Sequence, residues 1–180
     1  MKKLLRKLNI PNISGIAVGL ALVIVIYFLS YLLMQNPYQS VHNDILKTAD
    51  NIRNYYRDDP GYWKLDTEAA KSASLIPEDL LQYEDFDIKI GQGENGDLSM
   101  PYNLTFDVTV GNLNKSACIS LSEIKISREE SLGLQKITII TENKTTEFVW
   151  GDEENKLPIS KWKTRNICQM NGNKIMWTFQ

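Results

Sequence analysis

Histidine and cysteine are scarce in this sequence, which restricts the chemistry that it can perform. The 180 residues include one histidine, His42, and two cysteines, Cys118 and Cys168. Because transition-metal sites draw most of their ligands from these two residue types, little remains for such a site. His42 stands beside Val41, apart from any acid–nucleophile set, so we expect it on the surface or the packed side of a helix. We expect no enzyme, no metal and no cofactor.

Charge is missing from a long stretch near the N-terminus. No residue from Ile16 to Met34 is charged. As a helix rising ~1.5 Å per residue, this stretch spans roughly 28 Å, close to the hydrocarbon thickness of a bilayer. The apolar core of a secretory signal is shorter, at about 7–15 residues, and no small-x-small cleavage site is evident after the stretch. The sequence therefore predicts a membrane-spanning helix, over residues 16–36, that stays in the membrane.

Acidic residues are absent from the leader at residues 1–15, which carries four cations: Lys2, Lys3, Arg6 and Lys7. Positive charge is retained on the cytoplasmic side, so the N-terminus is expected inside and residues 37–180 are expected as an exported domain. Without the four cations, the chain has 16 Lys and Arg against 22 Asp and Glu, a net charge of −6. Since phosphate contacts need clustered cations, we expect no direct binding of nucleic acid.

The two cysteines both fall in the part expected to be exported. An oxidising compartment favours a disulfide between Cys118 and Cys168, and two buried free thiols are the alternative. A bridge closing a loop of about 50 residues contributes on the order of 4 kcal/mol in the chain-entropy model. In a small domain, that contribution is large enough to decide whether the domain folds.

Apolar residues after Pro37 follow a helical period. Their spacings of 4, 4, 3 and 4 place them on one helix face, and Asp58-Asp59-Pro60-Gly61 ends the pattern. Pro37 would kink a helix without necessarily ending it. The apolar and amphipathic stretches can therefore form one long helix from about Ile16 to Tyr56. The face consists of Val41, Ile45, Ala49, Ile52 and Tyr56.

Short helices and then strands are expected after this helix. Asp66 can cap a helix over Thr67–Leu75, and Pro77 can open a turn at Glu78–Leu81. Asn114 can cap a helix over Lys115–Ile124. Helices followed mainly by strands predict an α+β domain with a mostly antiparallel sheet. Period-two alternation and β-rich composition predict the strands, around Phe86–Ile90, Leu104–Val110, Lys136–Thr141, Thr145–Trp150 and Lys174–Phe179.

A Gly-x-Gly-x-x-Gly spacing occurs at Gly91–Gly96. A dinucleotide site needs a helix directly after the glycines, whose N-terminus holds the pyrophosphate. Here Pro101 follows shortly and precedes another expected strand. We therefore interpret the glycines as a flexible connection between two strands.

The acidic runs and the tryptophans each have a structural and a functional interpretation. Glu129-Glu130 and Asp152-Glu153-Glu154 are expected to be solvated loop faces, with a weak cation site in the second run as the alternative. Four tryptophans are expected to pack in a small core, with a carbohydrate-binding groove as the alternative. They are Trp63, Trp150, Trp162 and Trp177.

Several segments in order resemble the type IV pilins, and more closely the type IVb pilins of thin conjugative and enteric-adhesion pili. The leader ends in Gly15, as at a prepilin peptidase site, with Ile16 as the first mature residue. Pro37-Tyr38-Gln39 falls where pilins often have a helix-kinking proline followed by Tyr and Gln. Other segments similar to the family are Ala49–Tyr56, Gly61–Asp79, Leu113–Leu121 with the first bridge cysteine, and Cys168–Phe179 with the final strand.

The resemblance implies a long N-terminal helix packed on the sheet and a C-terminal disulfide. It also implies partners: other pilin subunits through the N-terminal helix, the inner membrane before assembly, prepilin peptidase and the pilus assembly machinery. Most pilins carry a glutamate where this chain has Leu20, and that carboxylate is thought to pair with the terminal amine of a neighbouring subunit. Some pilin-like tip or initiator proteins also lack it, so a major and a minor subunit both remain open.

Two classes of function therefore follow from the sequence. The first is a structural subunit that sits in the inner membrane with its domain in the periplasm and then enters an extracellular pilus for adhesion or conjugative contact. The second is an uncleaved, signal-anchored periplasmic module of a secretion or transfer apparatus that does not polymerise. An anchored envelope enzyme is a third reading.

Overall fold

The computed structural model describes residues 19–27, 38–93, 104–123 and 133–180. The chain divides into two compact units, Met1–Pro37 and Tyr38–Gln180. In the first unit, residues 19–27 are helical, which covers most of the first half of the helix expected over 16–36. Within the described part of the chain, no helix has both the length and the apolarity that crossing a bilayer requires. The leader, the Gly15–Ile16 cleavage position and Pro37 lie outside the described residues.

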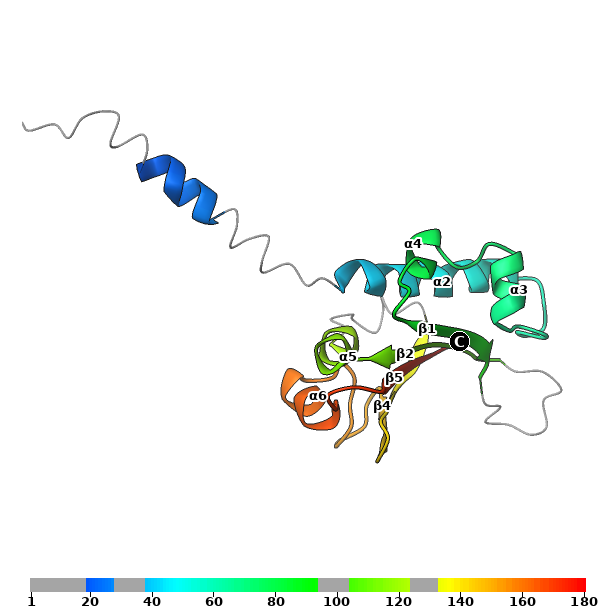
Figure 1. The fold of residues 1–180 in the computed structure, drawn as a ribbon. Coiled ribbons are helices and arrows are strands. Elements are labelled where there is room, and N and C mark those ends of the chain that lie inside the picture. The colour runs from blue at the N-terminus through cyan, green and yellow to red at the C-terminus, as the bar shows by residue number, and fades with distance from the viewer. Residues whose placement is uncertain (1–18, 28–37, 94–103, 124–132) are drawn as a thin grey trace, which may run out of the picture. The chain divides into compact units, whose positions relative to one another are not determined.

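The second unit opens with helix α2, Gln39–Tyr55, which confirms the amphipathic stretch expected there. Its apolar side chains at spacings of 4, 4 and 3 are fully buried: Val41, Ile45, Ala49 and Ile52. Figure 1 shows α2 lying across one face of the sheet. Each large apolar side chain buried here contributes about 1.5–3 kcal/mol, so this face holds the helix on the domain. Because residues 28–37 are not described, the continuous helix from Ile16 to Tyr56 stays a prediction.

Two short helices follow, α3 at Thr67–Ser72 and α4 at Glu78–Leu81. The Asp66 carboxylate caps α3 as expected, accepting a hydrogen bond of 2.7 Å from the amide of Ala69. The helix ends before the expected Leu75 because Ser74 adopts a left-handed φ of 55°. The amides of Ser74 and Leu75 then return to the carbonyls of Lys71 and Ala70, at 2.9 Å each, which closes the last turn.

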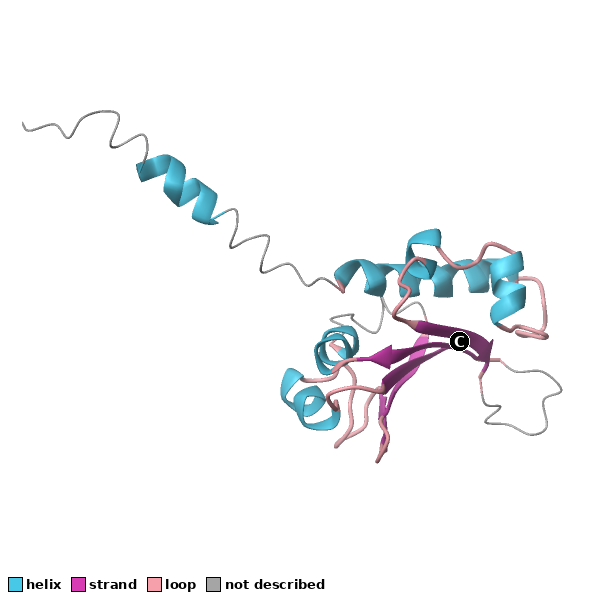
Figure 2. Cartoon of the chain, in the orientation of Figure 1, coloured by secondary structure: helices cyan, strands magenta, loops and turns pink. Residues whose placement is uncertain are grey.

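The sheet has five strands in the order β1-β2-β5-β3-β4, and every neighbouring pair is antiparallel. The α+β class and the antiparallel sheet are therefore confirmed (Figure 2). The last strand in the sequence occupies the centre and joins the β1–β2 and β3–β4 hairpins. The strands are β1 Asp87–Gln92, β2 Phe106–Leu113, β3 Leu134–Ile140, β4 Thr145–Val149 and β5 Asn173–Phe179.

One face of the sheet carries the core. A row across four strands contains only large apolar side chains, all at most 1% exposed: Val108, Trp177, Ile137 and Phe148. The next row stacks Phe106 on Phe179, with ring centroids 5.4 Å apart. The alternating residues on the other face include Thr109, Met176 and Glu147, so the period of two separates an apolar face from a mixed one.

Helices α5, Lys115–Ser122, and α6, Lys161–Ile167, are joined by the disulfide between Cys118 and Cys168. The bridge confirms the expected pairing over two free thiols. Asn114 caps α5 as expected, accepting a hydrogen bond of 2.9 Å from the amide of Ala117. Helix α6 was not expected from the sequence. It has no apolar stripe to predict it, and in the structure Thr164 is its one buried residue.

The glycine-rich stretch joins two strands, as expected. Gly91 lies in β1, the amide of Gly93 donates to the carbonyl of Thr105 at 2.9 Å, and the next described element is β2. A Cβ on Gly93 would collide with the Thr105 side chain, so the close approach of the two chains here requires glycine. The remainder of the stretch, including Gly96, lies outside the described residues.

Candidate functional site

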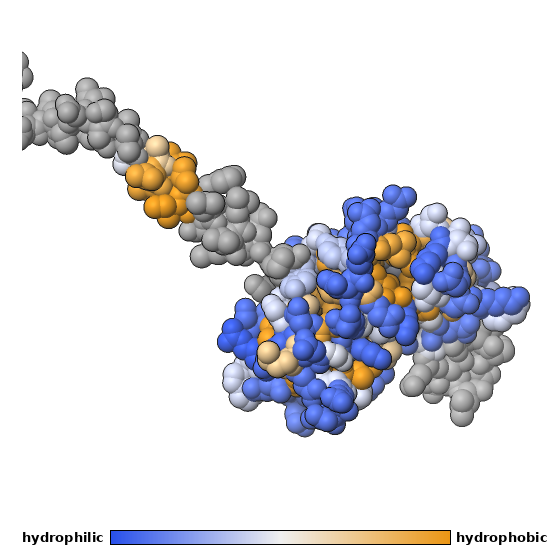
Figure 3. Space-filling model, in the orientation of Figure 1, coloured by the Kyte–Doolittle hydropathy of each residue, from blue (hydrophilic) through white to orange (hydrophobic). Residues whose placement is uncertain are grey.

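The helical segment at residues 19–27 exposes every large apolar side chain that it carries. Their exposed fractions run from 52% for Val25 to 75% for Tyr27. Figure 3 shows this segment as a continuous hydrophobic surface. A helix that is apolar all round needs lipid or other protein around it. The exposed side chains are Leu20, Leu22, Val23, Ile24, Val25, Ile26 and Tyr27.

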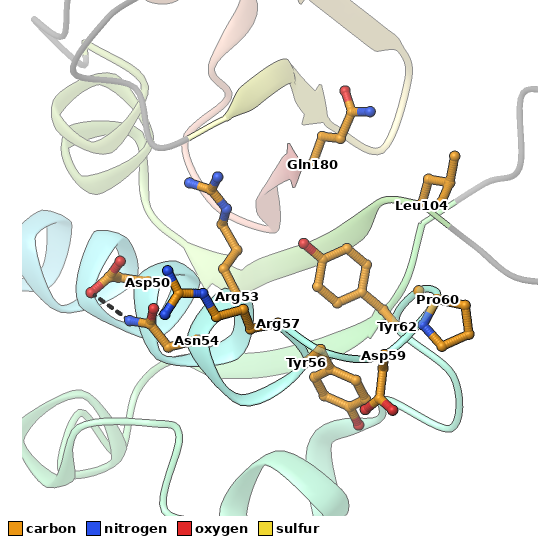
Figure 4. A pocket seen from close by; sticks show the side chains of 11 residues that line it. Asp50, Arg53, Asn54, Tyr56, Arg57, Asp59, Pro60, Tyr62, Leu104 and Gln180 are labelled. Atoms are coloured by element: carbon orange, nitrogen blue, oxygen red, sulfur yellow. Dashed lines mark hydrogen bonds between the residues drawn. The ribbon is translucent and has the colours of Figure 1, made fainter.

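A polar cavity lies in the second unit, at the C-terminal end of α2, with a volume of about 470 Å³. Four separate parts of the chain form it: the last turns of α2, the loop after it, Leu104 before β2 and Gln180 after β5 (Figure 4). Its lining is mostly polar and aromatic: Asp50, Arg53, Asn54, Tyr56, Arg57, Asp59, Pro60, Gly61, Tyr62, Leu104 and Gln180.

Arg53 and Arg57 give the cavity its positive charge. Arg53 lies in the last turn of α2, and Arg57 lies in the turn that directly follows the helix. In the described part of the chain, neither guanidinium forms an ion pair; the ion pairs there are made by lysines. Of the two acids in the lining, Asp50 accepts a hydrogen bond of 3.2 Å from Asn54. Both guanidinium groups therefore keep donors available for a ligand.

Tyr62 links the cavity to the core. Its ring packs against Phe106 and Tyr56, with centroids 4.6 and 5.8 Å away. Burial raises the pKa of the Tyr62 hydroxyl, and the Arg53 guanidinium offsets part of that rise through its charge and a hydrogen bond. The hydroxyl is therefore neutral at physiological pH and stands beside a cation. Because Phe106 is fully buried, this wall of the cavity is held in place by the core.

The sequence could not locate this cavity. The spacing of Arg53 and Arg57 is typical of any exposed helix face, and Tyr62, Leu104 and Gln180 come from distant parts of the chain. The tryptophans do not form the groove considered from the sequence. Trp177 is buried and the Trp150 ring N–H donates to the carbonyl of Leu134 at 2.7 Å. Trp63, in a turn, and Trp162, in α6, are 62% and 74% exposed, so the expected packing in the core is wrong for these two. None of the four lines one of the three cavities found among the described residues.

The other residues considered from the sequence lie outside the polar cavity. Asp152 accepts hydrogen bonds from the amides of Glu154 and Asn155, so its carboxylate closes a local turn. Among the described residues there is no group of three or more His, Cys, Asp and Glu that could hold a metal ion. His42 lies half-buried on α2, and burial lowers its pKa. Leu20 lies in the exposed apolar segment at 19–27, in the other unit from the disulfide.

No protein-family model and no curated protein matches this chain. Function must therefore be inferred from the residues and their geometry. Two features are candidates for a functional role. The apolar segment is suited to association with lipid or with other helices, and the polar cavity is suited to a small ligand.

Proposed function

We propose that this chain is a structural subunit, major or minor, of a type IVb-like pilus. The observation that carries the proposal is the exposed apolar segment at residues 19–27, which precedes in sequence a disulfide-bonded α+β domain. An apolar segment of this kind can reside in the inner membrane before assembly. After assembly the same side chains can be shielded from water by copies of the same helix.

The energetics of both states favour the proposal. Each large apolar side chain gains about 1.5–3 kcal/mol when it leaves water, and seven such side chains are exposed between residues 20 and 27. Either lipid or neighbouring helices can supply that shielding, so extraction from the bilayer is offset when the helix enters a bundle. The partners are therefore other subunits, the inner membrane, a prepilin peptidase and the assembly machinery, with no nucleic acid bound directly.

The exported domain supports the same proposal. Helix α2 lies on an antiparallel sheet whose core contains aromatic and branched side chains, and the disulfide joins α5 to the end of α6. Such a domain is suited to an oxidising compartment and to a filament surface, where it makes contact with other cells for adhesion or conjugation. A structural role requires no catalytic set.

Leu20 supports the second candidate, a signal-anchored periplasmic module that does not polymerise. Where a pilin has a buried glutamate, the pairing of that carboxylate with a neighbour's amine supplies register between subunits. Leu20 cannot make this pair. A minor subunit at a filament tip and an anchored module both accommodate leucine at this position.

Mass spectrometry of the chain extracted from membranes tests the proposal. Cleavage at the expected site gives a mature chain that begins at Ile16, with the new amine methylated. A chain that begins at Met1 contradicts the pilus proposal and favours the anchored module. If cleavage is found, the amount of the chain in sheared filaments distinguishes the subunit types: abundant chain indicates a major subunit and traces indicate a minor one.

A further inference from the structure

The polar cavity at the end of α2 lies wholly in the second unit, whereas the apolar segment belongs to the first. Its lining offers donors and acceptors of different charge within one space of about 470 Å³. That volume falls within the range of small-molecule sites, roughly 300–1,000 Å³. The cavity is therefore large enough to hold a small molecule.

The charges in the lining narrow the class of ligand. Two guanidinium groups, of Arg53 and Arg57, stand with two carboxylates, of Asp50 and Asp59. A multiply charged anion such as phosphate would be repelled by the Asp50 carboxylate. A ligand with one carboxylate and several hydroxyls fits better, because the carboxylate pairs with a guanidinium and a hydroxyl donates to Asp50.

The arrangement of the side chains separates the place for a ligand carboxylate from the Asp59 carboxylate. In Figure 4 the Arg53 side chain and the Tyr62 hydroxyl point toward the same space, with Gln180 beyond them. The Asp59 carboxylate points away from that space, past Tyr56. A ligand carboxylate can therefore meet Arg53 and the Tyr62 hydroxyl without meeting Asp59.

The walls suit a ring-shaped ligand. Tyr56, Tyr62 and Leu104 supply apolar surface beside the polar groups. The ring of Tyr62 is fixed by its contact with Phe106, so this surface exists before any ligand arrives. The amides of Asn54 and Gln180 can exchange hydrogen bonds with ring hydroxyls.

We infer that this cavity binds an acidic sugar, a sugar ring that carries one carboxylate. Arg53 holds the carboxylate together with the Tyr62 hydroxyl, and Arg57 adds a second cationic donor. The aromatic rings contact the sugar ring, and Asp50 and the amides bond its hydroxyls. This site is independent of the pilus proposal, because it lies wholly in the second unit and can be occupied in a chain that never polymerises.

Ligand-observed NMR titrations of the full chain in detergent micelles test the inference. The probes are glucuronate and N-acetylneuraminate, with glucose as the matched neutral sugar and inorganic phosphate as the matched anion without a ring. We expect at least one acidic sugar to bind about tenfold or more tightly than glucose, since a charge-assisted hydrogen bond is lost with the carboxylate. Phosphate is expected to bind more weakly than that sugar.

Two substitutions and a matched control locate the site. Arg53→Gln and Arg57→Gln should each weaken binding of the acidic sugar, by about tenfold for Arg53→Gln because it faces Tyr62. Arg165→Gln, on the exposed surface of α6, should leave binding unchanged. Circular dichroism melting of each variant verifies folding, and the exposed position of Arg57 makes that variant informative even if Arg53→Gln unfolds.

Three results would overturn the inference. The first is equal affinity for glucose and for both acidic sugars, or no detectable binding of any of the three. The second is phosphate binding as tight as that of the acidic sugar, which would indicate a general anion site. The third is unchanged binding in folded Arg53→Gln and Arg57→Gln variants, which would place the sugar elsewhere.

Discussion

Asn173, the first residue of β5, is a fully buried amide that joins three parts of the chain. Its Nδ2 donates to the carbonyls of Leu113, at 2.9 Å, and Gln169, at 2.8 Å. Its Oδ1 accepts from the amide of Gln169 at 2.7 Å. These bonds tie the segment after the disulfide to the end of β2. They also satisfy the carbonyl of Leu113 and both backbone polar groups of Gln169.

Replacing Asn173 with alanine should therefore be costly. Asn173→Ala removes all three bonds and leaves buried backbone groups without partners, each costing about 1–3 kcal/mol. We expect a loss of about 3 kcal/mol or more in the free energy of unfolding, measured by urea titration of the full chain in detergent. Asn171→Ala, the same change at an exposed position two residues away, should alter it by less than about 0.5 kcal/mol. Equal effects of the two changes would contradict the assigned role.

His42, the only histidine, gives the domain a dependence on pH. Burial lowers its pKa in the folded chain, whereas an unfolded histidine titrates near ~6.5. As the pH falls below about 7, the unfolded state takes up the proton first, so the free energy of unfolding decreases. The loss continues until the pH reaches the lowered pKa of the folded state.

Urea titrations at about pH 7.5 and about pH 5.5 should show this decrease, and His42→Gln should reduce it, because the histidine contribution acts between these values. Asp44 acts in the opposite sense at lower pH: burial is the main cause that raises its pKa, and its protonation favours the folded state. The same decrease in His42→Gln as in the natural chain would show that another group is responsible.

At the scale of the element, α2 depends on one apolar face. Ile45 is fully buried, and Ile45→Ala should lower the free energy of unfolding by about 2–5 kcal/mol through lost contacts and a cavity. Lys47→Ala, on the exposed side of the same helix, should change it by less than about 0.5 kcal/mol. Thermal melting followed by circular dichroism checks both, and a similar loss in the two variants would mean that the helix is not held by this face.

Elements with a strong period could be predicted from the sequence, and elements formed by distant contacts could not. Helix α2 could be predicted because its buried residues repeat at helical spacing: Val41, Ile45, Ala49 and Ile52. The polar composition of α6 gives no such signal, since its position depends on the disulfide and on contact with α5. The early end of α3 depends on a left-handed serine, where glycine is the usual signal.

The candidate site shows the same limit on prediction from the sequence: contacts between distant parts of the chain cannot be foreseen. The disulfide could be predicted because a chain with two cysteines has one possible intramolecular bridge. The polar cavity could not, because Tyr62, Leu104 and Gln180 meet only after the sheet has formed. Asn112 adds a local irregularity: it has a φ of 59°, which asparagine adopts more readily than most residues, where the register of β2 shifts.

At the scale of the whole molecule, the disulfide links α5 to the end of α6 across 50 residues of sequence. The double change Cys118→Ser with Cys168→Ser should lower the free energy of unfolding by about 4 kcal/mol in the chain-entropy model. That is a large fraction of the roughly 5–15 kcal/mol typical of a folded protein. The natural chain in reductant should match the variant in a urea titration. Equal stability of the oxidised chain and the variant would show that the bridge constrains little.

The central place of β5 has a consequence for the order in which the sheet can be completed. The two hairpins, β1–β2 and β3–β4, can each form from neighbouring residues, yet they join into one sheet only when residues 173–179 pair with both of them. A nascent chain whose last residues are not yet free therefore presents two unpaired inner edges, those of β2 and β3. Such edges are open to wrong pairing with other chains. Prompt pairing of β5 with both hairpins therefore protects the folding chain from aggregation.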